Sequence, residues 1–176
     1  MGNSKWAIDP THSEIGFKVK HMMFTNVSGK FNQFEAAIEN DEEAFETSQI
    51  SFSADVNSVD TANADRDGHL RSADFFDVEN FAKLSFKSTS IQKVNDGLYN
   101  ISGDLTIKDV IKNITLETEY SGLMKDPWGN TKIGLSLNGK INRKDFGLTW
   151  NAALETGGVL VGEDIKLAAE VQFVKQ

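Results

Sequence analysis

The chain contains no cysteine, and only 2 of its 176 residues are proline. Without thiols it can form no disulfide, carry out no thiol catalysis and hold no cysteine-bound zinc or iron–sulfur centre. Neither Pro10 nor Pro127 falls within an alternating apolar/polar stretch. Because proline interrupts the hydrogen bonding of central strands, this placement is compatible with strands along most of the chain.

Basic residues and long apolar runs are also scarce. The 18 lysine and arginine residues are outnumbered by 26 aspartate and glutamate residues, which gives a net charge of -8. This charge repels phosphate backbones, so we expect no nucleic-acid partner. No apolar run approaches the roughly 20 residues that a membrane-spanning helix needs, so we expect no integral membrane segment. The first residues lack the apolar segment of a secretory signal, which predicts a cytoplasmic location.

What the sequence does have is a regular alternation of apolar and polar residues. Ile50, Phe52 and Ala54 alternate with serine and aspartate, and the same pattern returns near 114–120, 133–141 and 165–173. A period of two places the apolar residues on one face of a strand. We expect strands near 12–20, 29–39, 47–57, 82–94, 97–107, 111–124, 131–142 and 164–175, and we expect 97–107 to form a hairpin with 111–124.

About eight antiparallel strands, each apolar on one face, favour an all-β, up-and-down barrel. The length of 176 residues fits a single domain over 1–176. A barrel of this size has room inside for one small ligand. The 12 phenylalanines could fill the interior or line a pocket, and the pattern leaves both readings open. Gly103, Gly122, Gly134 and Gly139, which we place within strands, mark close approach, bending or a cavity.

The segment 61–80 departs from the alternation and predicts a short helix. Thr61 or Asn63 could cap a helix that ends near Ser72. Together with Phe75 and Phe76, this helix would close one end of the barrel as a plug or lid. A second short crossing is expected near 22–28, where Met22, Met23 and Phe24 would also offer an apolar dimer interface.

Metal binding is an alternative reading of the same helical segment. Five residues match positions of a calcium-binding loop, namely Asn63, Asp65, Asp67, Gly68 and Asp74. However, asparagine stands at the first position, and Arg66 and Arg71 cancel part of the charge. These departures disfavour a calcium site.

The three histidines define the main enzymatic alternative. His12, His21 and His69 each lie near a carboxylate in the sequence, as a metal-dependent hydrolase would require. No spacing fixes two of them on one element, so hydrogen-bonded structural histidines are the simpler reading. We expect no catalysis and no cofactor. A third possibility is a stress-related structural barrel filled by its own side chains.

Several motifs resemble the YceI-like, polyisoprenoid-binding family, in order along nearly the whole chain. The opening segment 6–21 contains Trp6, Asp9, His12 and His21 at the spacing of that family's first signature. Further matches are Gly29-x-Phe31, Ser58-Val59-Asp60-Thr61, Arg66-Asp67-x-His69-Leu70-Arg71-Ser72, Asp74-Phe75-Phe76-Asp77, Gly103-Asp104-Leu105-Thr106-Ile107, Asn142-Arg143-x-Asp145-Phe146-Gly147 and Gly158-Val159-Leu160-Val161-Gly162.

This resemblance implies an extended, lipocalin-like barrel with an apolar tunnel for a long-chain isoprenoid or similar amphiphilic lipid, held for storage or transport. It also implies no known catalysis and a homodimer. Combined with the alternation, it predicts these tunnel residues: Phe17, Val19, Phe31, Phe34, Phe52, Phe75, Phe76, Phe86, Ile101, Leu105, Leu116 and Leu135.

The polar head of such a lipid would need hydrogen-bond donors and positive charge. The candidates are Arg66, His69, Arg71 and Arg143. The competing reading is structural, because Arg66 and Arg143 could instead pair with aspartates and fix loops.

The sequence departs from the family in two places. Many relatives carry a secretory signal, whereas this sequence shows none. A family proline is missing from 108–113, so we expect a different turn there within an intact barrel.

Overall fold

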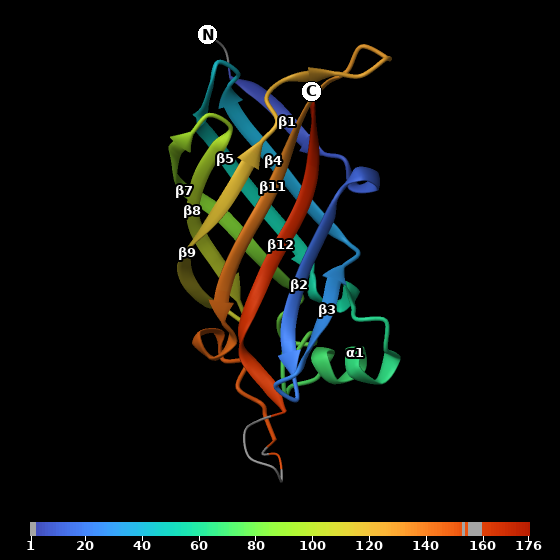
Figure 1. Cartoon of the computed structure of the whole chain (residues 1–176). Helices are drawn as coiled ribbons and strands as arrows, with labels where there is room; N and C mark the ends of the chain where they lie inside the picture. The colour runs from blue at the N-terminus through green and yellow to red at the C-terminus, as the bar shows by residue number, and fades with distance from the viewer. Residues whose placement is uncertain (1–2, 153, 155–159) are drawn as a thin grey trace.

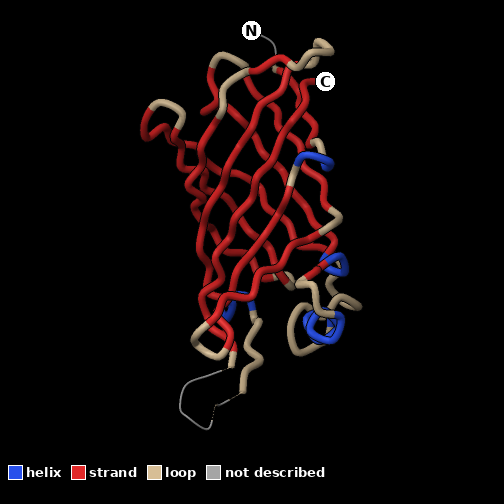
Figure 2. The backbone as a smooth tube through the Cα atoms, turned by 45° about the vertical axis from the view of Figure 1, so that its right-hand side comes forward, coloured by secondary structure: helices blue, strands red, loops and turns tan. Residues whose placement is uncertain are grey.

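The computed structural model describes residues 3–152, 154 and 160–176. Strands wrap around a central axis, and the first described residues and the C-terminus lie at the end of the barrel opposite the helix (Figure 1). The short helical segments gather mainly around one end, as Figure 2 also shows. Among the described residues, none of the helices has the length and apolar character needed to span a membrane.

Eight antiparallel strands close the barrel, in the order β11, β9, β8, β7, β5, β4, β1 and β12, with β12 pairing back to β11. Their bounds are β1 (Ser4–Ile8), β4 (Phe34–Asp41), β5 (Ala44–Asp55), β7 (Lys83–Asn95), β8 (Leu98–Ile107), β9 (Val110–Tyr120), β11 (Thr131–Asn142) and β12 (Val161–Lys175). The expected all-β, up-and-down barrel is therefore confirmed. The expected hairpin is also confirmed, since β8 and β9 pair through a two-residue turn at Lys108 and Asp109.

Four further strands extend the sheet: β2 (Glu14–His21), β3 (Thr25–Phe31), β6 (Val59–Asp60) and β10 (Met124–Lys125). Strand β12 pairs with β1 at its C-terminal end and with β2 over the rest of its length. The 3-10 turn η1 (Pro10–His12) separates β1 from β2. Around this turn, the Asp9 amide donates to the Gln172 carbonyl at 2.8 Å, and the Gln172 amide donates to Ser13 Oγ at 3.0 Å.

Three details differ from the sequence prediction. The strand β1 was not predicted, because its five residues are too few to show a clear alternation. The segment expected as one strand at 29–39 is divided between β3 and β4, because the chain bends at Asn32 and Gln33. The second crossing expected near 22–28 is wrong: Met22 to Phe24 form the turn between β2 and β3.

The one α-helix of the described residues, α1 (Ala64–Arg71), forms where it was predicted. The Asn63 side chain accepts a hydrogen bond from the Arg66 amide at 3.0 Å and so caps the helix. Asp67 fixes the preceding chain, since its Oδ1 accepts from the Thr61 amide at 2.9 Å. Short 3-10 turns η2 (Val56–Ser58) and η3 (Arg143–Phe146) lie at the same end of the barrel (Figure 1).

Candidate ligand-binding tunnel

A cavity of about 590 Å³ occupies the inside of the barrel. Its wall is formed mainly by apolar side chains from alternate residues of the strands. From β12, the alternating residues Ile165, Leu167, Ala169, Val171 and Phe173 line the cavity, together with Val161 and Ala168. With a rise of about 3.3 Å per residue and a strand tilt of about 40°, the alternating residues extend roughly 20 Å along the barrel axis. The cavity is therefore an elongated tunnel.

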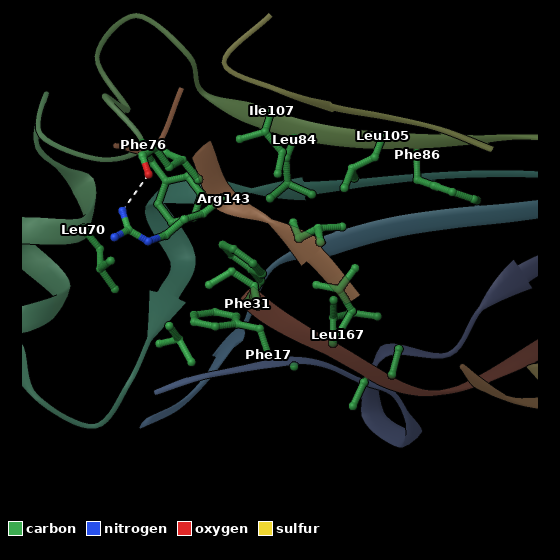
Figure 3. Close-up of a pocket in the computed structure, with 18 of the residues that line it drawn as sticks. Phe17, Phe31, Leu70, Phe76, Leu84, Phe86, Leu105, Ile107, Arg143 and Leu167 are labelled. Atoms are coloured by element: carbon green, nitrogen blue, oxygen red, sulfur yellow. Dashed lines mark hydrogen bonds between the residues drawn. The ribbon is translucent and has the colours of Figure 1, made fainter. Parts of the chain in front are cut away.

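The structure places eleven of the twelve predicted tunnel residues on the wall of this cavity. Figure 3 shows Phe17, Phe31, Phe76, Phe86 and Leu105 among them, projecting from different strands and from the segment after α1. Phe34 is the exception. It does not line the cavity, and its ring packs against Phe52 with a centroid distance of 6.5 Å. Contact with a ligand remains a prediction for the eleven residues on the wall.

Many lining residues were not singled out in the sequence, although a signal for them was present. The β12 residues and Ala36 of β4 lie on the apolar phase of their strands. Counting every apolar residue on the inward face of an alternating strand as a wall residue would have found them. Trp150 and Leu160 lie outside regular strands, so no periodicity pointed to them.

One end of the tunnel, which we call the closed end, is filled by aromatic side chains. The Phe45 ring stacks on the Tyr120 ring at 4.3 Å between centroids and meets the edge of Tyr99 at 4.8 Å. Burial raises the pKa of both tyrosines above its usual value. Trp6 belongs to the same buried core, and its Nε1 donates to Asn40 Oδ1 at 2.8 Å. None of these residues lines the cavity.

The opposite end, which we call the open end, reaches the surface beside α1. The cavity is lined there by α1 residues, including the exposed Asp65, and by Lys20 of β2. The His69 ring packs against Trp150 and Phe75, with centroid distances of 4.5 and 5.0 Å. These contacts hold α1 against the segment after β11, so that the helix covers part of the opening.

Arg143 is almost completely buried at the open end and is bound by backbone oxygens. Its Nε donates to the Gly162 carbonyl at 2.8 Å, and its Nη1 donates to the carbonyls of Leu148 and Trp150 at 2.6 and 2.9 Å. A fourth bond joins Nη2 to the Val161 carbonyl at 3.2 Å. Burial lowers the pKa of this guanidinium from its usual value. Its side chain therefore ties η3 to the start of β12 and leaves one of its five N–H groups for another acceptor.

The other predicted head-group residues are also engaged in local contacts. Arg66 lines the cavity, but its Nε donates to Thr61 Oγ1 at 2.8 Å and its Nη2 to the Thr61 carbonyl at 2.7 Å. Arg71 is not on the cavity wall, and its Nε donates to the Asn57 carbonyl at 3.1 Å. The structure thus brings Arg66, His69 and Arg143 to the open end, and places Arg71 behind them as an anchor for α1.

The residues of the metal-site alternatives are dispersed. His12 Nδ1 lies 2.8 Å from Asp9 Oδ2 beside η1, and His69 Nε2 lies 2.9 Å from Asp74 Oδ2. Within the described part of the chain, no three histidine or carboxylate side chains come together as a metal site would require. Of the residues in the calcium-loop reading, Asn63 caps α1, while Asp65, Asp67 and Gly68 lie within the helix and Asp74 lies beyond its end.

Inward-facing glycines shape the tunnel wall. A Cβ atom at Gly29, Gly103 or Gly139 would lie 2.3 to 2.5 Å from Phe17, Phe86 or Leu116, respectively. Each glycine therefore makes room for a side chain of the neighbouring strand. Gly122, expected within a strand, instead follows the end of β9 with a φ of 79°.

Comparison with known proteins identifies the fold and the family. The family model described as the YceI-like domain matches residues 6–173. A UPF0312 protein of Staphylococcus aureus strain N315 is 36% identical over 171 residues, which cover 97% of each chain. The structure of the Campylobacter jejuni YCEI protein is 34% identical, with a TM-score of 0.76 over 89% of this chain and 90% of that chain.

Two less similar structures share the fold alone. Burkholderia cenocepacia BcnA superimposes with a TM-score of 0.80 at 19% identity, covering 94% of this chain and 98% of its own. A polyisoprenoid-binding domain from Saccharophagus degradans superimposes with a TM-score of 0.74 at 14% identity, covering 97% and 98%. Because the family model spans nearly the whole sequence, and a homologue more than one third identical covers the same length, this chain belongs to the YceI-like domain family.

Proposed function

We propose that this protein binds one extended isoprenoid, or a similar long-chain amphiphilic lipid, inside the tunnel and stores or transports it without catalysing a reaction. The observation that carries this proposal is the apolar cavity of about 590 Å³, closed by aromatic residues at one end and open at the other. The same cavity argues against a barrel filled by its own side chains.

The driving force would be the burial of the apolar chain. An extended isoprenoid several units long would remove several hundred Å² of apolar surface from water. At about 25 cal/mol per Å², this contributes roughly 10 kcal/mol before the cost of ordering the ligand. Affinity would therefore depend mainly on the length of apolar chain that the tunnel accommodates.

Membership of the YceI-like family supports this proposal, as does the fold shared with a domain described as polyisoprenoid-binding. The polar head of the ligand would remain at the open end, near Arg66, His69 and Arg143. Arg143 has four of its five N–H groups bound to carbonyls, whereas Arg66 uses two and keeps three, so Arg66 would be the main donor to an oxygen-bearing head at this end.

The first test is mass spectrometry of the protein as purified from its native host, under native and then denaturing conditions. We expect a stoichiometric isoprenoid or other long-chain lipid that is released on unfolding. A lipid-free protein that also fails to bind isoprenoid alcohols of any length after purification would overturn the proposal.

Two adjacent alanines of β4 provide a matched pair of variants. Ala36 lines the tunnel, whereas Ala37 is exposed on the outer surface. We expect Ala36→Phe to block part of the tunnel and to weaken binding of the longest isoprenoid alcohols most. Ala37→Phe adds the same apolar group outside and should leave binding unchanged. Equal effects of the two variants would show that the ligand does not enter the tunnel.

A further inference from the structure

The turn between β2 and β3 carries three consecutive exposed apolar residues, Met22, Met23 and Phe24, which we call the tip. Their relative exposures are 42%, 59% and 79%. The Met22 amide donates to the Leu160 carbonyl at 2.8 Å, and Leu160 lines the tunnel. The tip is therefore attached directly to the wall of the open end.

The residues of the tip are poorly suited to the backbone that they adopt. Met22 and Met23 have φ values of 52° and 66°, in the left-handed region where glycine and asparagine are favoured. The Phe24 amide donates to the His21 carbonyl at 3.2 Å and closes the turn. The turn from β8 to β9 has the same left-handed pair at Lys108 and Asp109, where both residues are charged. The apolar side chains of the tip are thus not explained by turn formation or by core packing, which indicates a surface role.

Three lysines lie near the tip on the outer surface of the barrel. Lys18 and Lys20 of β2 are exposed, Lys20 at the rim of the open end where it also lines the cavity, and Lys18 pairs in register with Lys166 of β12. We call these three residues the basic band. Among the described residues, none of the three takes part in an ion pair. Nearby acidic residues of β12 are already neutralised, because Glu163 pairs with Lys144 at 2.8 Å and Asp164 with Lys140 at 3.2 Å.

The basic band contrasts with the rest of the protein. The whole chain has a net charge of -8, and α1, on the other side of the opening, carries Asp65 and Asp67. An apolar tip beside a cluster of lysines is the arrangement by which peripheral proteins dock on anionic lipid surfaces. In a two-fold symmetric dimer formed through this surface, the lysines of the two copies would face one another and repel, so a second copy is a poorer occupant than an anionic bilayer.

We propose that the tip and the basic band dock this protein on an anionic phospholipid bilayer, with the open end of the tunnel facing the membrane. Met22, Met23 and Phe24 would enter the boundary between head groups and acyl chains, while Lys18, Lys20 and Lys166 contact phosphates. The docking surface follows from the exposed residues themselves. Its purpose, the transfer of a lipid between bilayer and tunnel without exposure to water, rests on the proposed function.

The test is flotation of the lipid-free protein with vesicles of phosphatidylcholine and phosphatidylglycerol in equal amounts, and with vesicles of phosphatidylcholine alone. We expect clear binding to the anionic vesicles that weakens as salt is added. In the variant Met22→Asn/Met23→Gly/Phe24→Ser, we expect vesicle binding to fall at least about tenfold, which corresponds to ~1.4 kcal/mol. This variant should fold normally, because Asn-Gly is favoured in the left-handed turn.

A second variant, Lys18→Gln/Lys20→Gln/Lys166→Gln, should lose the preference for anionic vesicles. The control is Leu123→Ser/Met124→Ser/Trp128→Ser, which removes three exposed apolar residues near the closed end and should bind vesicles like the unmodified protein. The proposal is overturned if the unmodified protein does not float with anionic vesicles, or if the control variant loses binding while the tip variant keeps it.

The oligomeric state and isoprenoid binding separate the remaining possibilities. If the tip variant floats normally but changes from dimer to monomer in sedimentation equilibrium, the tip is a dimer interface and the proposal is wrong. The tip variant should still bind a short isoprenoid alcohol added in solution with unchanged affinity. If the tip variant loses vesicle binding but still binds the isoprenoid alcohol, docking is supported. If the unmodified protein floats with anionic vesicles but binds no isoprenoid alcohol, the proposed function alone is contradicted.

Discussion

The ring of Phe86 lies over Gly103, so a Cβ atom at position 103 would come 2.4 Å from Phe86 Cζ. The two residues lie on neighbouring strands, β7 and β8, and both face the inside of the barrel. The same arrangement joins Leu116 to Gly139, where the corresponding distance to Leu116 Cδ2 is 2.5 Å. The bore of the tunnel is therefore set by large side chains that rest on glycines instead of projecting fully into the interior.

Adding a methyl group at Gly139 should narrow the tunnel at little cost in stability. In Gly139→Ala, the flexible end of Leu116 must move, while the next nearest atom, the Thr115 carbonyl oxygen, is 3.6 Å away. We expect the affinity for the longest isoprenoid alcohols to fall about tenfold, as for the loss of about two buried methylene groups. Titration with alcohols of increasing length measures this effect. Gly68→Ala in α1, where no atom lies within 4 Å of the added Cβ, is the control and should leave affinity unchanged.

Replacing Arg143 should destabilise the open end of the barrel. Arg143→Met removes the donors to the carbonyls of Leu148, Trp150 and Gly162 and leaves these partly buried oxygens unpaired. We expect the free energy of unfolding to fall by about 3 kcal/mol in urea titrations, since each unpaired buried acceptor costs about 1–3 kcal/mol. If stability is unchanged but isoprenoid binding is lost, the main role of Arg143 is to contact the ligand and not to fix the loop.

Removing an aromatic ring from the closed end should lengthen the tunnel. In Phe45→Ala, the ring that stacks on Tyr120 and meets Tyr99 is deleted, and a stability loss of about 3–5 kcal/mol is expected for such a truncation. The variant should accept longer isoprenoid alcohols than the unmodified protein. Phe45→Leu keeps most of the volume and should retain the original length limit. If neither substitution changes the preferred chain length, the closed end does not limit the tunnel.

Acid should weaken the junction between β1 and β2. Hydrogen bonds from Thr11 and His12 lower the pKa of Asp9 from 3.8 to about 2. Because the pKa is lower in the folded protein, ionised Asp9 stabilises the fold above its unfolded-state pKa, and this contribution is lost as the pH falls through about 2. Asp9→Asn should therefore melt at a lower temperature than the unmodified protein at about pH 6, with the difference vanishing near pH 2. A difference independent of pH would show that the carboxylate charge is not involved.

The local sequence determined much of the fold because strand alternation and helix capping depend on residues close together in the chain. Ile50, Phe52 and Ala54 showed which face of β5 turns inward, and Asn63 indicated where α1 begins. The alternation predicted the strand near 12–20 that forms β2, but it predicted neither β1 nor the way in which β1 and β2 share one edge of β12. They are separate strands along one edge of β12, and their pairing depends on Gln172, about 160 residues away in the sequence.

The candidate site was likewise only partly predictable from the local sequence. The inward phase of each strand identified Phe17, Phe86 and Leu135 as interior residues, but alternation cannot tell a packed interior from a tunnel. That difference depends on barrel closure, on strand register and on the volumes of side chains from all eight strands together. Only the tertiary structure decided that Phe45 meets Tyr99 and Tyr120 to close one end, and that Arg143 binds carbonyls, because these contacts join segments whose separation in sequence carries no local signal.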